Sequence, residues 1–391
     1  MSAGAFQAVL IVLLLAPVAV AAQDPDHLVL GGEDEADGTV FYPRQVEEGP
    51  DGDLYVLDVG DSFIKVFAPD GAFRRRLGGS GEGPGEFQRV DGATFGFTPD
   101  GKLFFTEYIR GHRWITILEL NGDLARVLSP NLAVGFGIEA ARALDDGGFL
   151  VQITYNATPI AEGDYFLYHV PRSLVRLDGQ GEIVAEIART KCARLISYSP
   201  NGGTTNLPFA PSFAWSAVGD DAVVWSDGTS PRLRVIDHAG SLVREMETRL
   251  PDPRKVTRED LREWKREREE MMSSRNPAWW HEFGRVVEEY DKSLYDQPIL
   301  RRISRTPGGN LLVEGPWQAD TDASTFWLLD SDGEVIHSIT AAAARLRLSE
   351  HYLLFLTVDD EGAVLANAVK RPIDEAEALA RLEMIAAGRS E

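Results

Sequence analysis

The sequence predicts an all-β fold, a six-bladed β-propeller of four-stranded antiparallel blades. Three observations support this prediction. A strand–turn unit recurs six times along the 391 residues. Its spacing of about 45 to 50 residues is typical of a propeller. An apolar leader precedes the first unit, and the chain has one cysteine, Cys192, so no intrachain disulfide can form. Packing and closure of the ring must therefore stabilise the fold.

The repeat is clearest in the first unit. Asp51-Gly52 turns the chain into a strand at 54–58, and Asp70-Gly71 separates a strand at 64–67 from one that starts at Phe73. Alternating β-branched and aromatic residues between Asp-Gly pairs are typical of β-hairpins. Four such strands make one antiparallel blade.

Both turns recur along the chain. The turn between the first and second strands returns at Asp100-Gly101, Asp146-Gly147, Gly219-Asp220, Gly308-Gly309 and Glu361-Gly362. The turn between the third and fourth strands returns at Asn121-Gly122, Asp178-Gly179, Ala239-Gly240 and Asp332-Gly333. The sixth unit lacks this second turn, so we expect an N-terminal strand, from 27–30 or 39–42, to complete that blade and remove its open edge. The tail at 373–387 fits either a helix or, at 381–385, the missing third strand.

Residues 43–87 resemble the NHL-repeat class of six-bladed propellers, of the bacterial exported type. The specific part is the linker Gly-Glu-Gly-Pro-Gly-Glu-Phe at 81–87. The resemblance implies the propeller fold for the whole domain, although the later blades match only by their pattern of turns and strands. Some propellers of this class are lyases that hold zinc with histidines and are stapled by disulfides. Their ligand residues have no counterpart here.

Residues 1–22 contain no charged side chain, and polar sequence begins at Gln23. This pattern predicts a signal peptide at 1–22, followed by the propeller at 27–387. We expect an exported protein, periplasmic or extracellular, without stable membrane insertion after cleavage; an uncleaved N-terminal anchor is the alternative.

The chain is strongly acidic. It has 39 Lys and Arg against 61 Asp and Glu, and its formal net charge is −22. Such a surface repels phosphate backbones and anionic headgroups, which argues against a nucleic-acid partner.

No set of residues indicates catalysis. Seven histidines are scattered without metal-ligand spacing. Asp58, Glu107 and Asp227 hold equivalent positions at the ends of second strands, and Glu314 is one residue off this register. Together they could suggest a Ca²⁺ ring, but the remaining equivalent positions are Ile153, Gly315 and Ala368. We therefore predict no catalytic residues, no metal and no cofactor. The predicted function is a binding or scaffold module; the alternative is a Ca- or Zn-dependent hydrolase or lyase at the central channel.

A helical insert at 251–298 is expected between blades four and five. Thr257 and Asp260 form a capping box. Beyond Pro277, apolar residues recur at helical spacing, at Trp280, Phe283, Val287, Tyr290 and Leu294. This second helix either packs down on the propeller or forms a lid or partner groove.

Three long connections indicate the working face. They cover 155–170, 190–211 and 251–298, and all join strands at the end of the blades opposite the Asp-Gly turns. We expect a protein, peptide or glycan ligand to bind a monomer there. Aromatic and polar residues of these and neighbouring loops form the predicted site: Arg110, His112, Tyr165, Tyr168, His169, Tyr198, Trp279, Trp280, His281 and Trp317.

The leader yields a first testable prediction. We expect the exported protein to begin near Gln23, because small residues at 19–22 follow an apolar run that is short for a membrane span. N-terminal sequencing of protein purified from its host measures this start, and an intact Met1 in the membrane fraction would contradict it.

Overall fold

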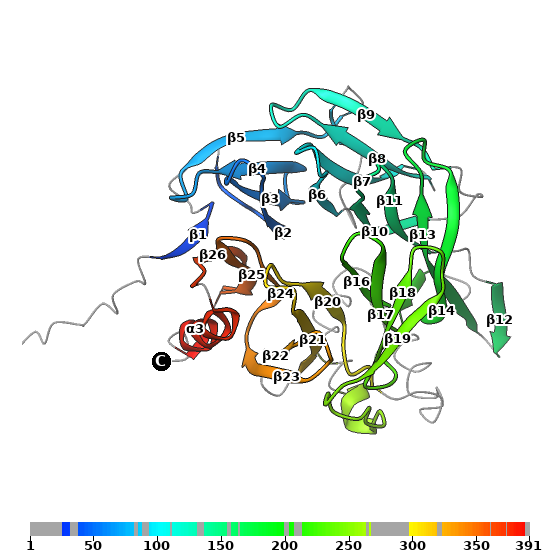
Figure 1. Cartoon of the computed structure of the whole chain (residues 1–391). Coiled ribbons are helices and arrows are strands. Elements are labelled where there is room, and N and C mark those ends of the chain that lie inside the picture. Colours follow the sequence, from blue (N-terminus) through cyan, green and yellow to red (C-terminus); the bar gives the residue numbers. More distant parts are fainter. Residues whose placement is uncertain are drawn as a thin grey trace, which may run out of the picture.

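The structure is a computed structural model. It describes residues 26–31, 38–81, 85–87, 94–109, 112–130, 137–154, 158–162, 165–198, 203–206, 213–262, 266, 297–318, 323–359, 361–372 and 374–387. Six antiparallel sheets are arranged around one axis (Figure 1), as the sequence predicted.

Four of the sheets are simple four-stranded blades in chain order. Blade one has β2 (Pro43–Glu48), β3 (Leu54–Asp58), β4 (Phe63–Phe67) and β5 (Phe73–Gly78). Blade two has β6 (Phe95–Phe97), β7 (Leu103–Ile109), β8 (His112–Leu118) and β9 (Leu124–Leu128). Blade four has β16 (Ala214–Val218), β17 (Ala222–Ser226), β18 (Arg232–Asp237) and β19 (Leu242–Glu247). Blade five has β20 (Arg302–Arg305), β21 (Leu311–Gln318), β22 (Ala323–Leu329) and β23 (Val335–Ala341).

The tight turns depend on glycine residues in a left-handed backbone conformation. Gly52 has a φ of 79° and Gly71 a φ of 87°, a left-handed conformation that a Cβ disfavours. In both turns the preceding aspartate accepts a hydrogen bond from a backbone N–H two residues on, Asp51 from Asp53 and Asp70 from Ala72. The first strand of each blade therefore runs toward the face that carries these turns. We call this the turn-side face, and the opposite one the loop-side face.

Blade three is larger than predicted. Its sheet contains β10 (Gly137–Ala143), β11 (Phe149–Thr154), β13 (Tyr165–Leu177), β14 (Ile183–Tyr198) and β15 (Gly203–Asn206), and β12 (Thr158–Glu162) pairs with β13. The interpretation of 155–170 and 190–211 as long loops is therefore wrong for most of these residues. Runs such as Tyr-Phe-Leu-Tyr-His-Val at 165–170 have high β-propensity, and antiparallel pairing with 193–198 satisfies their backbone hydrogen bonds.

The N-terminal strand closes the ring. Blade six contains β24 (Ala344–Leu348), β25 (Tyr352–Val358) and β26 (Val364–Lys370), and β1 (His27–Leu30) is its outermost strand. His27 pairs with Val369 and Leu30 with Ala366. The predicted closure is confirmed, and of the two candidate segments it is 27–30 that provides the strand.

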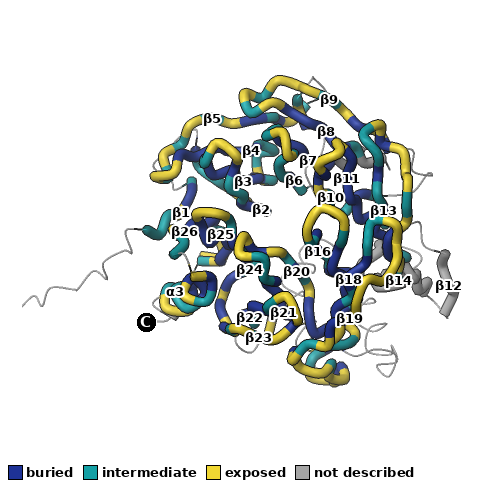
Figure 2. The backbone as a smooth tube through the Cα atoms, in the orientation of Figure 1, coloured by how far each residue is buried: buried dark blue, intermediate teal, exposed yellow. Residues whose placement is uncertain are grey.

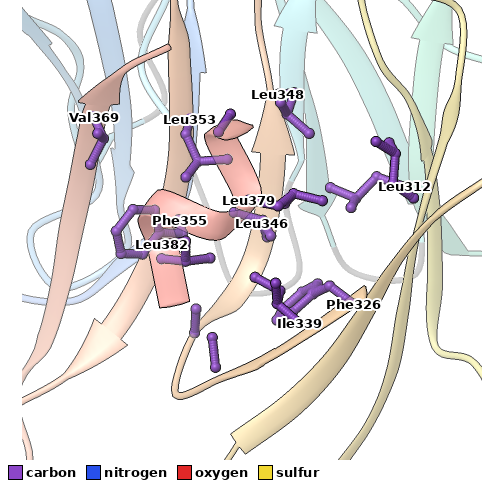
Figure 3. Packing of buried hydrophobic residues seen from close by; sticks show 14 residues of the cluster. Leu312, Phe326, Ile339, Leu346, Leu348, Leu353, Phe355, Val369, Leu379 and Leu382 are labelled. Carbon is purple, nitrogen blue, oxygen red and sulfur yellow. The ribbon is translucent and has the colours of Figure 1, made fainter. Parts of the chain in front are cut away.

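The C-terminal tail is the helix α3 (Glu375–Ala387) and contributes no strand. Its Leu379 and Leu382 are buried against Leu346 and Phe355 of blade six (Figure 3). At its start, Glu375 accepts hydrogen bonds from the hydroxyl of Thr306 and the backbone N–H of Gly308 in blade five. The helix thus ties blades five and six together.

Apolar clusters between neighbouring blades form the core. One cluster joins Tyr55 and Leu57 of blade one to Phe95 and Phe105 of blade two, and others link the remaining neighbours in the same way. Burial follows the middle of each blade, whereas the turns are exposed (Figure 2). The six innermost strands, β2, β6, β10, β16, β20 and β24, surround the axis (Figure 1).

Little of the expected helical insert is described. Residues 258–262 and 266 are helical, and they lie between β19 and β20 in the chain. The capping box is present: the backbone N–H of Thr257 donates to Asp260 at 2.6 Å, and that of Asp260 to the Thr257 hydroxyl at 3.2 Å. The second expected helix lies outside the described residues. Within the described ranges, no helix is long and apolar enough to cross a membrane.

If β1 closes the ring, mutations of its buried and its exposed side chains should affect stability differently. Leu30 is 2% exposed and packs against blades one and six, whereas its neighbour Val29 is 43% exposed. We expect Leu30→Ala to lower the free energy of unfolding by about 3 kcal/mol, because it leaves a cavity at the seam. Val29→Ala, the matched control, should change it by less than about 0.5 kcal/mol. Denaturant unfolding measures both, and equal effects would show that the ring is closed elsewhere.

Candidate anion-binding site

The site residues predicted from sequence are placed only in part. Arg110, Trp279, Trp280 and His281 lie outside the described residues. The others belong to strands: His112 to β8, Tyr165, Tyr168 and His169 to β13, Tyr198 to β14 and Trp317 to β21.

Backbone register relates these residues to each other. Tyr165 is opposite Tyr198, so blade three brings this predicted pair together. His112 pairs with Ile109 beside the β7–β8 connection, and Trp317 pairs with Ser324 beside the β21–β22 connection. All of them lie at the loop-side ends of their blades, on three different blades. The single neighbourhood expected for the whole set stays a prediction.

Sequence reasoning missed a group of arginines around the axis. Six arginines belong to innermost strands of four blades: Arg44 of β2, Arg142 of β10, Arg302 and Arg305 of β20, and Arg345 and Arg347 of β24. Because the innermost strands converge, these residues are brought together although Arg44 and Arg347 are about 300 positions apart in the chain. The sequence pattern that could have revealed this group is the presence of arginine in the first strand of four of the six repeats.

The arginines form two layers along the axis. Arg44, Arg302 and Arg345 lie near the beginning of their strands, toward the loop-side face. We call these the loop-side arginines. The turn-side arginines, Arg142, Arg305 and Arg347, lie near the ends of theirs.

The pKa shifts divide the arginines into the same two layers. Burial, and next the guanidiniums of Arg302 and Arg44, lower the pKa of Arg345 from its ordinary value to about 9. Burial also lowers the pKa of Arg142, where Arg347 and Arg305 add to the effect. A guanidinium keeps its proton in nearly all proteins. The lowered pKa values therefore express an unfavourable free energy of the charged state, which a bound anion would relieve.

Few carboxylates balance this charge. Arg302 pairs with Glu314 at 2.8 Å, and Arg347 with Glu47 at 2.7 Å. Within the described ranges, no carboxylate lies at salt-bridge distance from Arg44, Arg142, Arg305 or Arg345, and Nε of Arg44 is buried without a hydrogen bond. Four of the six guanidiniums thus have spare donors toward the axis region.

The backbone is irregular where these side chains arise. A β-bulge shifts the register of β2 between Pro43 and Gln45, which places Arg44 at the extra position. Another bulge lies in β24 between Ala344 and Arg347, where Arg345 has a φ of 55°. Bulges turn a side chain away from the regular pleat, and a non-glycine residue in the left-handed region is strained. Both features occur at loop-side arginines, as expected where a side chain is directed toward a ligand.

A second charged network borders the axis at blade three. A third bulge places Glu139 at the extra position of β10. Its carboxylate pairs with Arg172 at 2.9 Å and accepts a hydrogen bond from Gln152 at 2.6 Å. The indole N–H of Trp215 in blade four donates to the Gln152 side chain at 2.9 Å. These groups satisfy one another and link two innermost strands, so their role is structural.

Three of the four carboxylates considered as a Ca²⁺ ring have other partners, and the side chain of the fourth, Glu107, lies outside the described part of the structure. Asp58 is fully buried and pairs with Lys65 at 2.8 Å. Glu314 pairs with Arg302, and Asp227 accepts a hydrogen bond from the Thr229 hydroxyl at 2.6 Å within its own turn. In the part of the chain that the structure describes, no three His, Cys, Asp or Glu side chains are grouped as metal ligands.

A surface hollow of about 410 Å³ on the outer part of blade four is a weaker candidate. Arg232 and Arg234 line it, but both pair with Glu245, and Arg232 also pairs with Glu247. Because their charges are already balanced, we assign the site to the axis.

No protein-family model matches the chain, and no curated protein is similar to it. Solved structures with similar folds are virginiamycin B lyase from Staphylococcus aureus (12% identity, 88% of this chain and 98% of that chain, TM-score 0.45) and a DUF4221 family member from Bacteroides vulgatus (10%, 88% and 96%, 0.46). A third is the calcium-binding protein regucalcin from Agrobacterium tumefaciens (10%, 85% and 92%, 0.41). These likenesses are too distant to carry function, and the fold assignment rests on the strand order described above.

If the arginine cluster serves ligand binding, its unpaired charges should lower the free energy of unfolding of the ligand-free protein. We expect Arg345→Asn to raise the free energy of unfolding by about 1 kcal/mol, since it removes a repelled charge and asparagine tolerates a positive φ. Arg347→Gln is the contrasting variant. It should lower the free energy of unfolding by about 1 kcal/mol, because it leaves Glu47 without its ion pair. Denaturant titration of both variants tests this, and a destabilised Arg345→Asn protein would contradict it.

Proposed function

We propose that the chain is an exported, non-catalytic binding module that holds an anionic ligand at the propeller axis. The single observation that supports this most is the group of arginines without carboxylate partners in a chain of net charge −22. A cluster of unpaired positive charges lowers the stability of the folded protein. Binding of a ligand that supplies the missing negative charges would explain why the cluster is retained.

The ligand should carry at least two carboxylate or phosphate groups. Arginine binds such groups through two parallel N–H···O bonds, and hydrogen bonds to charged groups contribute about 1.5 to 3 kcal/mol each. The two layers of arginines lie two positions apart in β24 and three positions apart in β20, which favours a ligand that extends along the axis. A peptide or glycan with acidic groups fits this description.

The loop-side face is the proposed way in. The bulged Arg44 and Arg345 lie toward it. The predicted tyrosines of blade three, with His112 and Trp317, belong to strand ends on the same face. We propose that the two-helix insert at 251–298 is a rim or lid there. We also propose that the signal peptide at 1–22 is cleaved, that the protein is a monomer, and that its fold is an NHL-type propeller.

A metal-dependent hydrolase or lyase at the axis is less well supported. Six guanidiniums in two layers create a positive potential, which opposes a divalent cation at this position. Glu314 and Glu47, the described carboxylates at salt-bridge distance from these arginines, are already paired with Arg302 and Arg347. The described part of the axis therefore favours anions over Ca²⁺ or Zn²⁺.

Citrate, a small tricarboxylate, tests anion binding directly. At constant ionic strength, citrate at 100 times its Kd should stabilise the wild-type protein by about 2.7 kcal/mol. The double variant Arg44→Gln, Arg345→Asn should bind citrate at least about tenfold more weakly, because two unpaired guanidiniums are lost. Thermal unfolding and calorimetric titration measure these effects.

The control is Arg232→Gln, Arg234→Gln, which removes two arginines from the outer part of blade four. Its affinity for citrate should match that of the wild type. Equal weakening in both double variants would mean that citrate responds only to net charge, and the proposal would then be wrong.

A further inference from the structure

Two adjacent aromatic side chains are exposed at the loop-side end of blade one, close in sequence to Arg44 of the arginine cluster. Phe41 is 63% exposed and Tyr42 is 54% exposed. They immediately precede β2 at its loop-side end, two and three residues before the bulged Arg44. Single exposed apolar residues are ordinary on protein surfaces. Here two occur in succession, close in sequence to Arg44, whose Nε is buried without a hydrogen bond.

The backbone of this pair is fixed by a buried carboxylate. Asp58 accepts hydrogen bonds from the N–H of Phe41 at 2.9 Å and of Tyr42 at 2.8 Å. The N–H of Val59 donates to the carbonyl of Tyr42 at 3.0 Å. Both aromatic residues are therefore anchored to the end of β3, although no strand pairs with them.

A buried lysine completes the support. Lys65 is 1% exposed and pairs with Asp58 and Asp61, each at 2.8 Å, and its ammonium group also donates to the carbonyl of Thr39. The same ammonium group lies 5.0 Å from the centre of the Phe41 ring, within the range of a cation–π interaction. Lys65 thus binds the segment at Thr39 and stabilises the ring at Phe41.

Close packing limits movement of the segment further. A Cβ at Gly60 would lie 2.7 Å from Cβ of Phe41, so only glycine fits beneath the ring. Ser62, in the same connection, has a φ of 65°, an unusual conformation for a residue other than glycine. A rigid backbone lowers the entropy cost of binding at the exposed rings. We call Phe41 and Tyr42 the aromatic platform.

We propose that the aromatic platform stacks against a sugar ring of a short acidic oligosaccharide whose carboxylates bind the loop-side arginines. This inference rests on the proposed function and names its ligand class. Both rings are more than half exposed. This arrangement suits the flat apolar face of a pyranose better than a peptide side chain, which needs walls around it.

The charge distribution sets the length of the ligand. Arg44, Arg302 and Arg345 offer positive charge at the platform's side of the axis, but the whole protein carries −22. A long polyanion would extend beyond the arginines and meet repulsion from the acidic surface. We therefore infer an oligosaccharide of a few residues, with uronic acids as the acidic sugars.

Three probes of graded chemistry test the inference. They are trigalacturonate, its methyl-esterified neutral form, and triglutamate, which carries carboxylates without sugar rings. We expect the wild-type protein to bind trigalacturonate most tightly. The variant Phe41→Ala, Tyr42→Ala should bind trigalacturonate about tenfold more weakly, since both stacking surfaces are lost, but should bind triglutamate as the wild type does.

A matched control replaces two equally exposed apolar residues elsewhere. Leu242 and Val243 on β19 are 58% and 60% exposed, and Leu242→Ala, Val243→Ala should leave trigalacturonate binding unchanged. The conservative variant Phe41→Tyr, Tyr42→Phe should also retain it, and denaturant unfolding confirms that each variant is folded.

The outcomes separate the two proposals. If the alanine platform variant binds trigalacturonate like the wild type while Arg44→Gln, Arg345→Asn does not, the platform is wrong and the anion site stands. If the platform variant loses triglutamate as strongly as trigalacturonate, the ligand is an acidic peptide and the sugar inference is wrong. If the wild type binds neither charged probe, both proposals fail.

Discussion

Pairing of β1 with β26 is the interaction on which the rest of the structure depends. The chain has a single cysteine, so no covalent bond can hold its two ends together. Instead, four register pairs from His27↔Val369 to Leu30↔Ala366 join the N-terminus to blade six. The buried Leu30 adds an apolar contact with blade one. Without this strand, blade six would keep an open edge, and the innermost strands would no longer be held at one distance around the axis. The arginine cluster exists only because the ring is closed.

Closure must also oppose the repulsion that it creates. Burial lowers the pKa of Arg142, Arg302 and Arg345 most, and neighbouring guanidiniums lower it further, so the charged arginines raise the free energy of the folded protein. Continuous apolar clusters between neighbouring blades, with α3 tied to blades five and six, supply the opposing free energy. Among the described residues, carboxylates at salt-bridge distance balance two of these six arginines, Arg302 and Arg347. Unpaired charges that lower the stability of a fold are expected mainly where they serve its function.

The sequence predicted what is local and missed what is brought together by topology. Asp-Gly turns encode their own conformation, so Asp51-Gly52 and its repeats revealed blades one to five. In blade six the prediction was wrong in one respect, because Glu361-Gly362 joins β25 to β26, the second and third strands, and not the first and second. The missing strand of the sixth unit nevertheless indicated closure by an N-terminal strand, for which 27–30 was one of two candidates. The hairpin extension of blade three was missed because loops were inferred from the Gly-, Asn- and Pro-containing flanks, whereas 165–170 and 193–198 pair as strands. The arginines were missed because nothing near Arg44 in the sequence indicates Arg345, and a bulge leaves no clear signature in a hydrophobic pattern.

The site and the seam of the ring lie at the same place, and this coincidence has a thermodynamic consequence. The aromatic platform belongs to the segment that connects the closing strand β1 to β2, and the N–H of Val40 donates to the carbonyl of Gly31 within it. Arg44 belongs to blade one, and Arg345 to blade six, on the two sides of the seam. An anion that contacts both arginines bridges the seam, and it binds only when the ring is closed. By linkage, such a ligand stabilises the closed ring as strongly as closure favours the ligand. The repulsion among the arginines then acts against closure only in the free protein, and binding converts it into attraction at the point where the ring is joined.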